Sequence, residues 1–286
     1  MACEKYQDYK PRHDARVLID HVNRTIYEFE GFKMTVRQIF YQLLGQNIIK
    51  NSTKIYKKIV DVVGKGRKGG FIDWDAIEDR TRTHRVLDHW DSPTELIQDA
   101  AKWYRRDWWE GQPYYIEVWT EKDALIGIIK DAAYSLGCSC CSCRGYNSLS
   151  EMLAAAQRFI DKEIQGYECI ILYLGDHDPS GINMTNDIKK RMELFHANVH
   201  VHRLALTMDQ VELYNLPPNT AKEKDKRYAS YKKLYGTDCW ELDALHPQVL
   251  HDMITDFIKT YQDQKMFEAV KAQQEAEREQ IKELLL

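Results

Sequence analysis

The spacing of apolar residues predicts three amphipathic helices in the first third of the chain. Their apolar stripes are Val17, Leu18, Val22 and Ile26 within residues 13–30, then Val36, Ile39, Phe40, Leu43 and Leu44 after a cap at Thr35, and then Ile55, Ile59, Val62 and Val63 after a cap at Ser52 or Thr53. A glycine-rich basic stretch, residues 64–70, follows the third helix. Three short helices that end in a Gly/Lys hairpin are typical of a winged helix-turn-helix, whose third helix enters the major groove of DNA.

Short apolar runs alternate with helical patterns in the second half of the chain. Residues 79–112 predict a polar helical connector, and Gly111 and Pro113 mark its end. The predicted strands are 115–119, a cysteine-rich strand at 138–143, 169–174 and 199–206, and the predicted helices are 124–136, 150–164 and 181–195. Strands that alternate with helices indicate an α/β fold with a mostly parallel, Rossmann-like sheet covered on both faces.

The chain therefore divides into four expected segments. They are a winged-helix DNA-binding domain at 1–85, a helical connector at 86–112, the sheet domain at 113–240 and a helical C-terminal extension at 241–286. The last stretch, from Gln264 onward, is very polar and predicts a tail helix or a partner contact.

Composition is ordinary for a soluble globular protein, with 44% hydrophobic and 29% charged residues. No apolar run approaches the length that spans a bilayer. Residues 1–16 lack the apolar core of a secretion signal. We therefore expect a cytoplasmic protein.

The distribution of charge is more informative than the net charge of −4. Between Lys33 and Arg85 there are twelve Lys or Arg and five Asp or Glu, a local excess of seven positive charges. Such a basic face is typical of DNA backbone binding, although a solvated helical surface would look the same. The candidate DNA contacts are Lys54, Lys57, Lys58, Lys65, Arg67, Lys68, Arg80 and Arg82. For Arg80 and Arg82, pairing with nearby acids is an equally good interpretation.

Four of the seven cysteines cluster in residues 138–143, which raises the question of zinc. On a strand, Cys138 and Cys140 face one way, whereas Cys141 and Cys143 face the other. They cannot converge on one ion, and their spacing matches no two-plus-two zinc pattern. We predict reduced cysteines that fill a buried sheet.

Three carboxylates follow the ends of two predicted strands. Glu121 comes just after the first strand, and Asp176 and Asp178 come just after the third. Because open parallel sheets bind ligands beyond the carboxyl ends of their strands, these side chains meet if the strands are neighbours. Hard oxygen donors without Cys or His favour Mg²⁺, which suits phosphoryl chemistry. Alone, the Asp-x-Asp pair could be a helix-capping turn.

In three separated places the sequence resembles topoisomerase VI A subunits and the meiotic double-strand-break protein, a family that joins a winged helix to a Toprim domain. The matching segments are Glu121-Lys122-Asp123-Ala124, the Asp-x-Asp-Pro-x-Gly pattern at 176–181, and Trp240-Glu-Leu-Asp-Ala-Leu245. The resemblance covers most of residues 35–260. It implies that the sheet domain is a Toprim domain and that Glu121, Asp176 and Asp178 bind Mg²⁺. It leaves the roles of Glu241 and Asp243 open.

The same family carries its nucleophile in an Arg-Asp-Ile-(Tyr/Phe)-Tyr motif, which is similar to residues 37–41 here. Tyr41 is therefore the catalytic candidate, and Gln38 stands where the family has Asp. Helix geometry places Tyr41 roughly 130° from the centre of the apolar stripe, so we expect it to be exposed. Arg37, one turn earlier, is a candidate phosphate clamp that would favour the phenolate.

The resemblance implies a transesterification in which Tyr41 attacks DNA and leaves a 5′-phosphotyrosyl link and a free 3′-hydroxyl. Glu121 is implied to shuttle a proton during rejoining. The family's active sites combine the tyrosine of one subunit with the metal site of another, so a homodimer on double-stranded DNA is expected. No glycine-rich nucleotide-binding motif occurs in the chain. Either a separate ATPase subunit exists, or the protein only cleaves or nicks.

Three other functions compete with this interpretation. In a hydrolytic Toprim nuclease, Mg²⁺ activates water and Tyr41 takes no part. In a non-catalytic DNA-binding protein, the metal site has no catalytic function. A small-molecule phosphotransferase on the same sheet would leave the basic N-terminal region unexplained.

Overall fold

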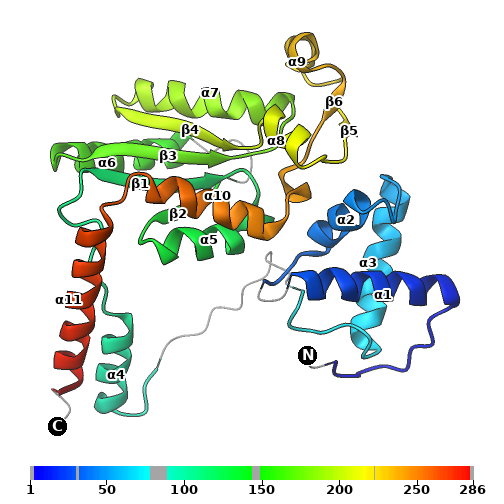
Figure 1. Ribbon diagram of the computed structural model, residues 1–286, viewed down its shortest axis with the longest axis horizontal. Helices are drawn as coiled ribbons and strands as arrows, with labels where there is room; N and C mark the ends of the chain where they lie inside the picture. The colour runs from blue at the N-terminus through cyan, green and yellow to red at the C-terminus, as the bar shows by residue number, and fades with distance from the viewer. Residues whose placement is uncertain (1–2, 30–31, 78–88, 144–148, 222, 284–286) are drawn as a thin grey trace.

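The computed structural model describes residues 3–29, 32–77, 89–143, 149–221 and 223–283. It has an N-terminal group of three helices, a larger part built on a parallel sheet, and a pair of helices that projects from that sheet (Figure 1). Arg80 and Arg82, two of the candidate DNA contacts, lie outside the described residues.

The three predicted N-terminal helices are confirmed. They are α1 (His13–Glu28), α2 (Val36–Gly45) and α3 (Thr53–Lys68). Their apolar faces form one core, in which Ile19, Val22, Ile39, Leu43 and Ile59 are almost completely buried. Val17, which was predicted to belong to the first apolar stripe, is instead exposed.

Local capping explains where α2 begins. The Thr35 hydroxyl accepts from the Gln38 backbone N–H at 3.3 Å, and the Gln38 side chain accepts from the Thr35 N–H at 2.7 Å. This reciprocal capping box satisfies two otherwise unpaired donors. Gln38 thereby has a structural role at the position where the resembling family carries Asp.

The glycine-rich stretch after α3 differs from the prediction. Residues 64–68 continue the helix instead of forming a hairpin, so the predicted hairpin is wrong for them. A turn follows at Gly69 and Gly70, where Gly70 has a positive φ of 74° that favours glycine. Among the described residues of this part, strand-like pairing is limited to the isolated bridges Lys5–Gly69 and Met34–Ile77.

The predicted parallel sheet is confirmed. Its four strands lie in the order β2-β1-β3-β4, and every neighbouring pair is parallel. The strands are β1 (Tyr114–Thr120), β2 (Ser139–Ser142), β3 (Glu168–Leu174) and β4 (Val199–Ala205). β1 and β3 pair directly along seven residues each, so their carboxyl ends are adjacent.

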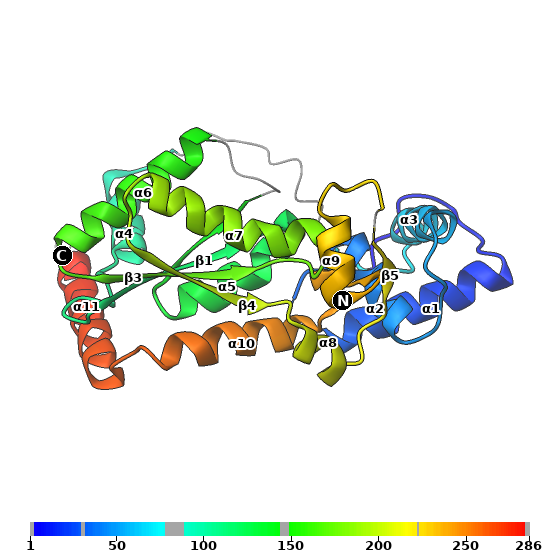
Figure 2. The ribbon, with the colours of Figure 1, turned by 90° about the horizontal axis from the view of Figure 1, so that it is seen from above.

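Helices cover both faces of the sheet, as the alternating pattern predicted (Figure 2). A 3₁₀ turn, η1 (Asp123–Leu125), leads into α5 (Ile126–Ser135), which covers one face together with α10 (Pro247–Lys259). The opposite face carries α6 (Leu149–Ile164) and α7 (Pro179–Leu194). Cys138 and Cys140 pack on the first of these faces, and Cys141 and Cys143 pack on the second. The predicted alternation of the cysteines is therefore confirmed, and all seven are free thiols.

Several elements beyond β4 were not predicted. They are α8 (Met208–Leu213), α9 (Tyr228–Tyr235), the short antiparallel pair β5 (Asn219–Thr220) and β6 (Asp238–Cys239), and the 3₁₀ turn η2 (Leu242–Ala244). The final helix, α11 (Gln264–Glu283), lies beside α4 (Pro93–Trp103), the helical part of the connector (Figure 1). The C-terminal segment is thus helical, as predicted, but its first helix, α10, packs in the core of the sheet.

None of the described helices combines the length and the apolar character that crossing a bilayer requires.

Candidate active site

The three predicted carboxylate residues lie at one edge of the sheet. Glu121 directly follows β1, and Asp176 and Asp178 follow the neighbouring strand β3. The Glu121 N–H donates to the Leu174 carbonyl at 2.9 Å, and the Asp176 N–H donates to Glu121 Oε2 at 3.3 Å. The Glu121 side chain therefore points toward the loop that carries both aspartates.

Two glycines make room for this carboxylate. A Cβ on Gly175 would lie 3.0 Å from Glu121 Oε2, and a Cβ on Gly181 would lie 3.1 Å from the same atom. On Gly181 it would also lie 2.2 Å from the Asp176 carbonyl oxygen, closer than real Cβ atoms come. Gly181, the glycine of the Asp-x-Asp-Pro-x-Gly pattern, is therefore required sterically in this loop.

Asp178 caps the helix that follows this loop and also acts electrostatically on Glu121. Its Oδ1 caps α7 by accepting from the Gly181 N–H at 2.6 Å and from the Ser180 hydroxyl at 3.0 Å. Its charge also acts on Glu121, whose pKa is raised by burial and then by Asp178. Two acids side by side, one of them buried, favour a cation between them.

Lys122 is the centre of a second acidic cluster that the sequence did not identify. Its Nζ lies 2.8 Å from Asp176 Oδ1 and 2.5 Å from Asp243 Oδ2, and it also contacts Glu241 Oε2. The Lys122 side chain is only 12% exposed, and that of Asp243 is fully buried. One ammonium thus neutralises part of the charge of three carboxylates.

The pKa values in this cluster depend on burial and on how strongly Lys122 stabilises each carboxylate. Burial raises the pKa of Asp176 to about 8, against the opposing effect of Lys122. Burial acts in the same direction on Glu241, but Lys122 and Arg37 outweigh it and bring the pKa of Glu241 to about 2. Glu241 is therefore the carboxylate that the cations stabilise most clearly as an anion.

Backbone pairing brings the segment at 240–243 to the sheet edge. Trp240 and His177 form an isolated antiparallel bridge with N–H to carbonyl distances of 2.8 and 3.0 Å. The Leu242 N–H then donates to Asp176 Oδ1 at 2.8 Å. The only sequence signal for Glu241 and Asp243 was the resemblance of the segment Trp240–Leu245, which gave no roles to its acids.

Arg203 on β4 is a further residue that the sequence did not identify. Its guanidinium donates to the carbonyl oxygens of Gly175 and Asp176 at 3.0 and 2.6 Å, and to that of Gly181 at 2.9 Å. It therefore fixes the loop backbone between β3 and α7. No local motif marks this arginine, because its partners are main-chain atoms of another strand's loop.

Arg37 joins the N-terminal helices to this edge. Its Nη2 donates to Glu241 Oε2 at 3.0 Å, and its Nε lies 3.8 Å from Asp243 Oδ2. Its guanidinium also lies 5.7 Å from the centre of the Tyr41 ring. The candidate clamp, the candidate nucleophile and the acidic edge are therefore neighbours within one chain.

The prediction that Tyr41 is exposed is wrong. Only 7% of Tyr41 is accessible, because its ring packs edge-on against Phe40 at 5.3 Å in the N-terminal core. The angular position of Tyr41 on an isolated helix did not reveal this burial, because the rest of the N-terminal core comes from other elements. Tyr41 instead lines a pocket of about 160 Å³ between α2 and the start of α3. The lining residues are Arg37, Phe40, Tyr41, Asn51, Ser52, Thr53 and Tyr56.

The electrostatics of Tyr41 also differ from the expectation. Burial raises its pKa to about 12, Glu241 adds to that effect, and Arg37 and Lys122 oppose it. Arg37 thus favours the phenolate, as predicted, but does not outweigh burial. The phenol is protonated near neutral pH.

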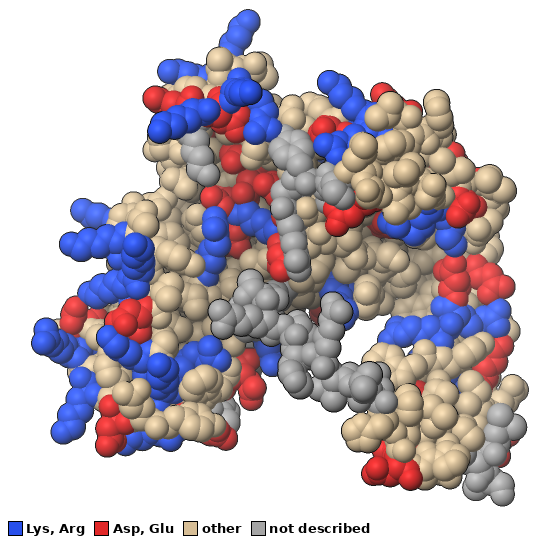
Figure 3. All heavy atoms as spheres, turned by 180° about the vertical axis from the view of Figure 1, so that it is seen from behind, with Lys and Arg blue, Asp and Glu red and all other residues tan. Residues whose placement is uncertain are grey.

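The predicted basic residues of α3 fall into three groups. Lys54, Lys57 and Lys68 are exposed and form no ion pair with described residues. Lys58 and Lys65 pair with Asp14 and Asp61 at 2.8 and 2.7 Å. Arg67 bonds the carbonyls of Trp74 and Ile77 and packs on the Trp74 ring, so it supports the turn after α3. Basic side chains gather on the N-terminal helices in the space-filling view (Figure 3).

The acidic edge has the type of ligands that a divalent cation needs, but not their arrangement. Five carboxyl groups (Glu121, Asp176, Asp178, Glu241, Asp243) lie near three cationic side chains (Arg37, Lys122, Arg203), so acidic groups outnumber basic groups by two. Such oxygen donors are the ligands that Mg²⁺ prefers. Within the described part of the chain, however, no three acidic, His or Cys side chains converge as metal ligands. Asp176 would have to turn from Lys122 toward Glu121 and Asp178 to complete the predicted set.

No family model, curated protein or solved structure matches the chain.

Proposed function

We propose that this protein cuts and rejoins DNA by Mg²⁺-dependent tyrosine transesterification, as a compact protein similar to topoisomerase VI A subunits. The observation that carries the proposal is the shared pocket of Tyr41, Arg37 and the start of α3, with Arg37 bonded to the acidic sheet edge. A phenol, a guanidinium and a helix N-terminus are groups that attack, neutralise and bind a phosphodiester. In this proposal α1–α3 form a winged helix-turn-helix and the sheet is a Toprim domain.

The proposed reaction conserves the number of phosphodiester bonds. Tyr41 Oη forms a bond to a DNA phosphorus, and the bond from phosphorus to the 3′-oxygen breaks. The phenolic proton passes to water, and the departing 3′-oxygen takes up a proton to become a free hydroxyl. Because burial holds the pKa of Tyr41 at about 12, the proton leaves during the attack and not before it. The reverse reaction rejoins the strand.

The other residues bind, orient and neutralise. Arg37 clamps the phosphate and lowers the pKa of the attacking phenol. Glu121, Asp176 and Asp178 would hold Mg²⁺, which supplies stabilisation of negative charge on phosphate oxygens. Glu121 is assigned to carry a proton during rejoining. Lys54, Lys57 and Lys68 position double-stranded DNA without reading its sequence.

The proposal extends to the assembly. We assign a cytoplasmic homodimer, which two linked breaks in a duplex require, and a separate ATPase subunit if strands are passed through the break. Without that subunit, the protein cleaves or nicks only.

The decisive experiment incubates the protein with supercoiled plasmid and Mg²⁺ and detects protein-linked DNA ends under denaturing conditions. Tyr41→Phe should abolish both cleavage and the covalent adduct. Tyr56→Phe is the matched control, because Tyr56 lines the same pocket and packs against the same Phe40. It should leave both signals intact.

Two results of this experiment would contradict the proposal and support a competing function instead. Cleavage that survives Tyr41→Phe and yields free ends identifies a hydrolytic nuclease. DNA binding that ignores Mg²⁺ and leaves plasmid uncut identifies a non-catalytic DNA-binding protein.

A further inference from the structure

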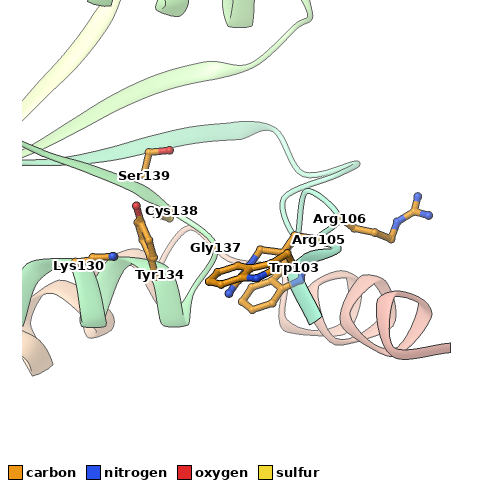
Figure 4. Close-up of a pocket in the computed structure, with 9 residues that line it drawn as sticks. Trp103, Arg105, Arg106, Lys130, Tyr134, Gly137, Cys138 and Ser139 are labelled. Atoms are coloured by element: carbon orange, nitrogen blue, oxygen red, sulfur yellow. The ribbon is translucent and has the colours of Figure 1, made fainter. Parts of the chain in front are cut away.

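A separate pocket of about 480 Å³ lies at the amino end of β2, away from the carboxyl edge that carries Glu121 and Asp176. Nine residues line it: Trp103, Arg105, Arg106, Trp108, Lys130, Tyr134, Gly137, Cys138 and Ser139. Its volume is within the range of small-ligand sites. The residues come from the end of α4, the connector, α5 and the start of the edge strand (Figure 4).

One wall of the pocket is held rigidly. The Trp108 Nε1 donates to Gln274 Oε1 at 2.8 Å, and its ring packs edge-on against Phe267 at 5.5 Å. Both partners belong to α11 and are buried. Gly137, with φ of 70°, lets the strand begin against this indole, since a Cβ there would lie 3.1 Å from the ring. The aromatic wall is therefore preformed.

Two other aromatic side chains that line the pocket are exposed to solvent. Trp103 is 73% accessible at the end of α4, and Tyr134 is 46% accessible on α5. Water-exposed indole and phenol faces around one cavity provide stacking surfaces for a flat ring.

The charges of the pocket are positive. Arg105 is exposed and forms no ion pair with any described residue, and Lys130 lies 5.2 Å from the centre of the Tyr134 ring. Arg106 differs, because it pairs with Glu110 and Glu277 at 2.8 Å and points away from the other labelled side chains (Figure 4). Arg105 and Lys130 are therefore the cations that remain for a ligand.

We propose that this pocket binds a nucleobase that carries a phosphate, with the base stacked against Trp103 beside the Trp108 wall and the phosphate held by Arg105 and Lys130. Flat aromatic surfaces beside free cations select an anion with an aromatic ring over a purely apolar or a cationic ligand. Two sources share this chemistry: a free nucleotide and an unpaired end of a nucleic acid strand. The site is independent of Tyr41 and does not rest on the proposed cleavage reaction.

The test measures binding of deoxyadenosine monophosphate by calorimetry and of a labelled short oligodeoxyadenylate by fluorescence anisotropy, with the full chain. Trp103→Ala and Arg105→Ala should each weaken binding about tenfold. Trp90→Ala is the matched control, since Trp90 is an exposed indole just before α4 that does not line the pocket. An abasic oligonucleotide should bind no better to the wild type than to Trp103→Ala.

The two probes separate the sources of the ligand. Binding of the mononucleotide identifies a nucleotide site, and binding of the oligonucleotide alone identifies a strand-end site. The proposal is overturned if neither probe binds, or if Trp103→Ala and Arg105→Ala leave the binding unchanged. Plasmid cleavage should be retained in Trp103→Ala, so failure of this site is distinguishable from failure of the Tyr41 chemistry.

Discussion

Arg37 and Glu241 are separated by 204 positions in the chain, yet Arg37 Nη2 donates to Glu241 Oε2 at 3.0 Å. The bond links helix α2 to the segment that closes the acidic edge of the sheet. It places Tyr41, on the same helix, within electrostatic reach of Glu241 and Lys122. The relative position of Tyr41, the candidate nucleophile, and the acidic edge thus depends in part on one ion pair.

A double-mutant cycle should detect this link. Arg37→Ala and Glu241→Gln are expected to couple by about 0.5–1 kcal/mol in unfolding free energy, because Arg37 remains 49% exposed and water screens the pair. The coupling should shrink as salt is added. Arg16→Ala is the control and should not couple to Glu241→Gln. A salt-independent value, or none at all, would show that the pair does not link the two parts.

Lys122→Met should be strongly destabilising. It leaves Asp176, Glu241 and Asp243 without their common buried cation, which costs about 3–5 kcal/mol when one partner of a buried pair is lost. Urea unfolding measures the change. Lys189→Met, an exposed lysine on α7, should stay within about 0.5 kcal/mol of wild type.

Mg²⁺ should partly restore the Lys122→Met variant, because the cluster then has one more uncompensated negative charge. Thermal unfolding with increasing Mg²⁺ should show a larger rise in Tm for this variant than for wild type. An equal or smaller rise would argue against a divalent cation at this edge.

The contact between Phe29 and His246 should make stability depend on pH. Their rings stack at 4.1 Å, and His246 Nδ1 caps α10 by accepting from the Gln248 N–H at 3.1 Å. Burial lowers the pKa of His246 from its usual value, and Glu28 opposes the shift. A depressed pKa in the folded state contributes stability above the unfolded value of about 6.5, and that stability is lost as pH falls below it.

The measurement compares Tm between roughly pH 7.5 and 5.5. His246→Asn keeps a capping oxygen but does not titrate, so its Tm should fall less than that of wild type. The corresponding difference in the free energy of unfolding between wild type and His246→Asn should be below about 1 kcal/mol, because His246 is partly exposed. His13→Asn, at an exposed position on α1, serves as control. Parallel curves for wild type and His246→Asn would refute the prediction.

The basic residues of α3 should separate into DNA contacts and structural groups. Alanine at Lys54, Lys57 or Lys68 should each reduce the slope of log affinity against log salt by about 0.9, without loss of stability. Arg67→Ala should instead destabilise the protein by about 1–3 kcal/mol, since it leaves the Trp74 and Ile77 carbonyls without their donor. Identical effects at all four positions would contradict this division.

The sequence by itself determined the three N-terminal helices, the strands and helices of the parallel sheet, and the edge of the sheet where the acids gather. Apolar periodicity located α1–α3 and the four strands, because burial of one face imposes a regular spacing on each element. The alternation of strands and helices indicated a parallel sheet, and the positions of Glu121, Asp176 and Asp178 after two strands placed them at its carboxyl edge.

Only the tertiary structure decided which charges meet there. The Trp240–His177 bridge brings Glu241 and Asp243 to Lys122, and the packing of α2 brings Arg37 to them. Packing in the N-terminal core also buries Tyr41, which a single helix leaves at the side of its apolar stripe. Local spacing specifies one face of one element, whereas ion pairs, burial and pKa values depend on which distant elements fold onto that face.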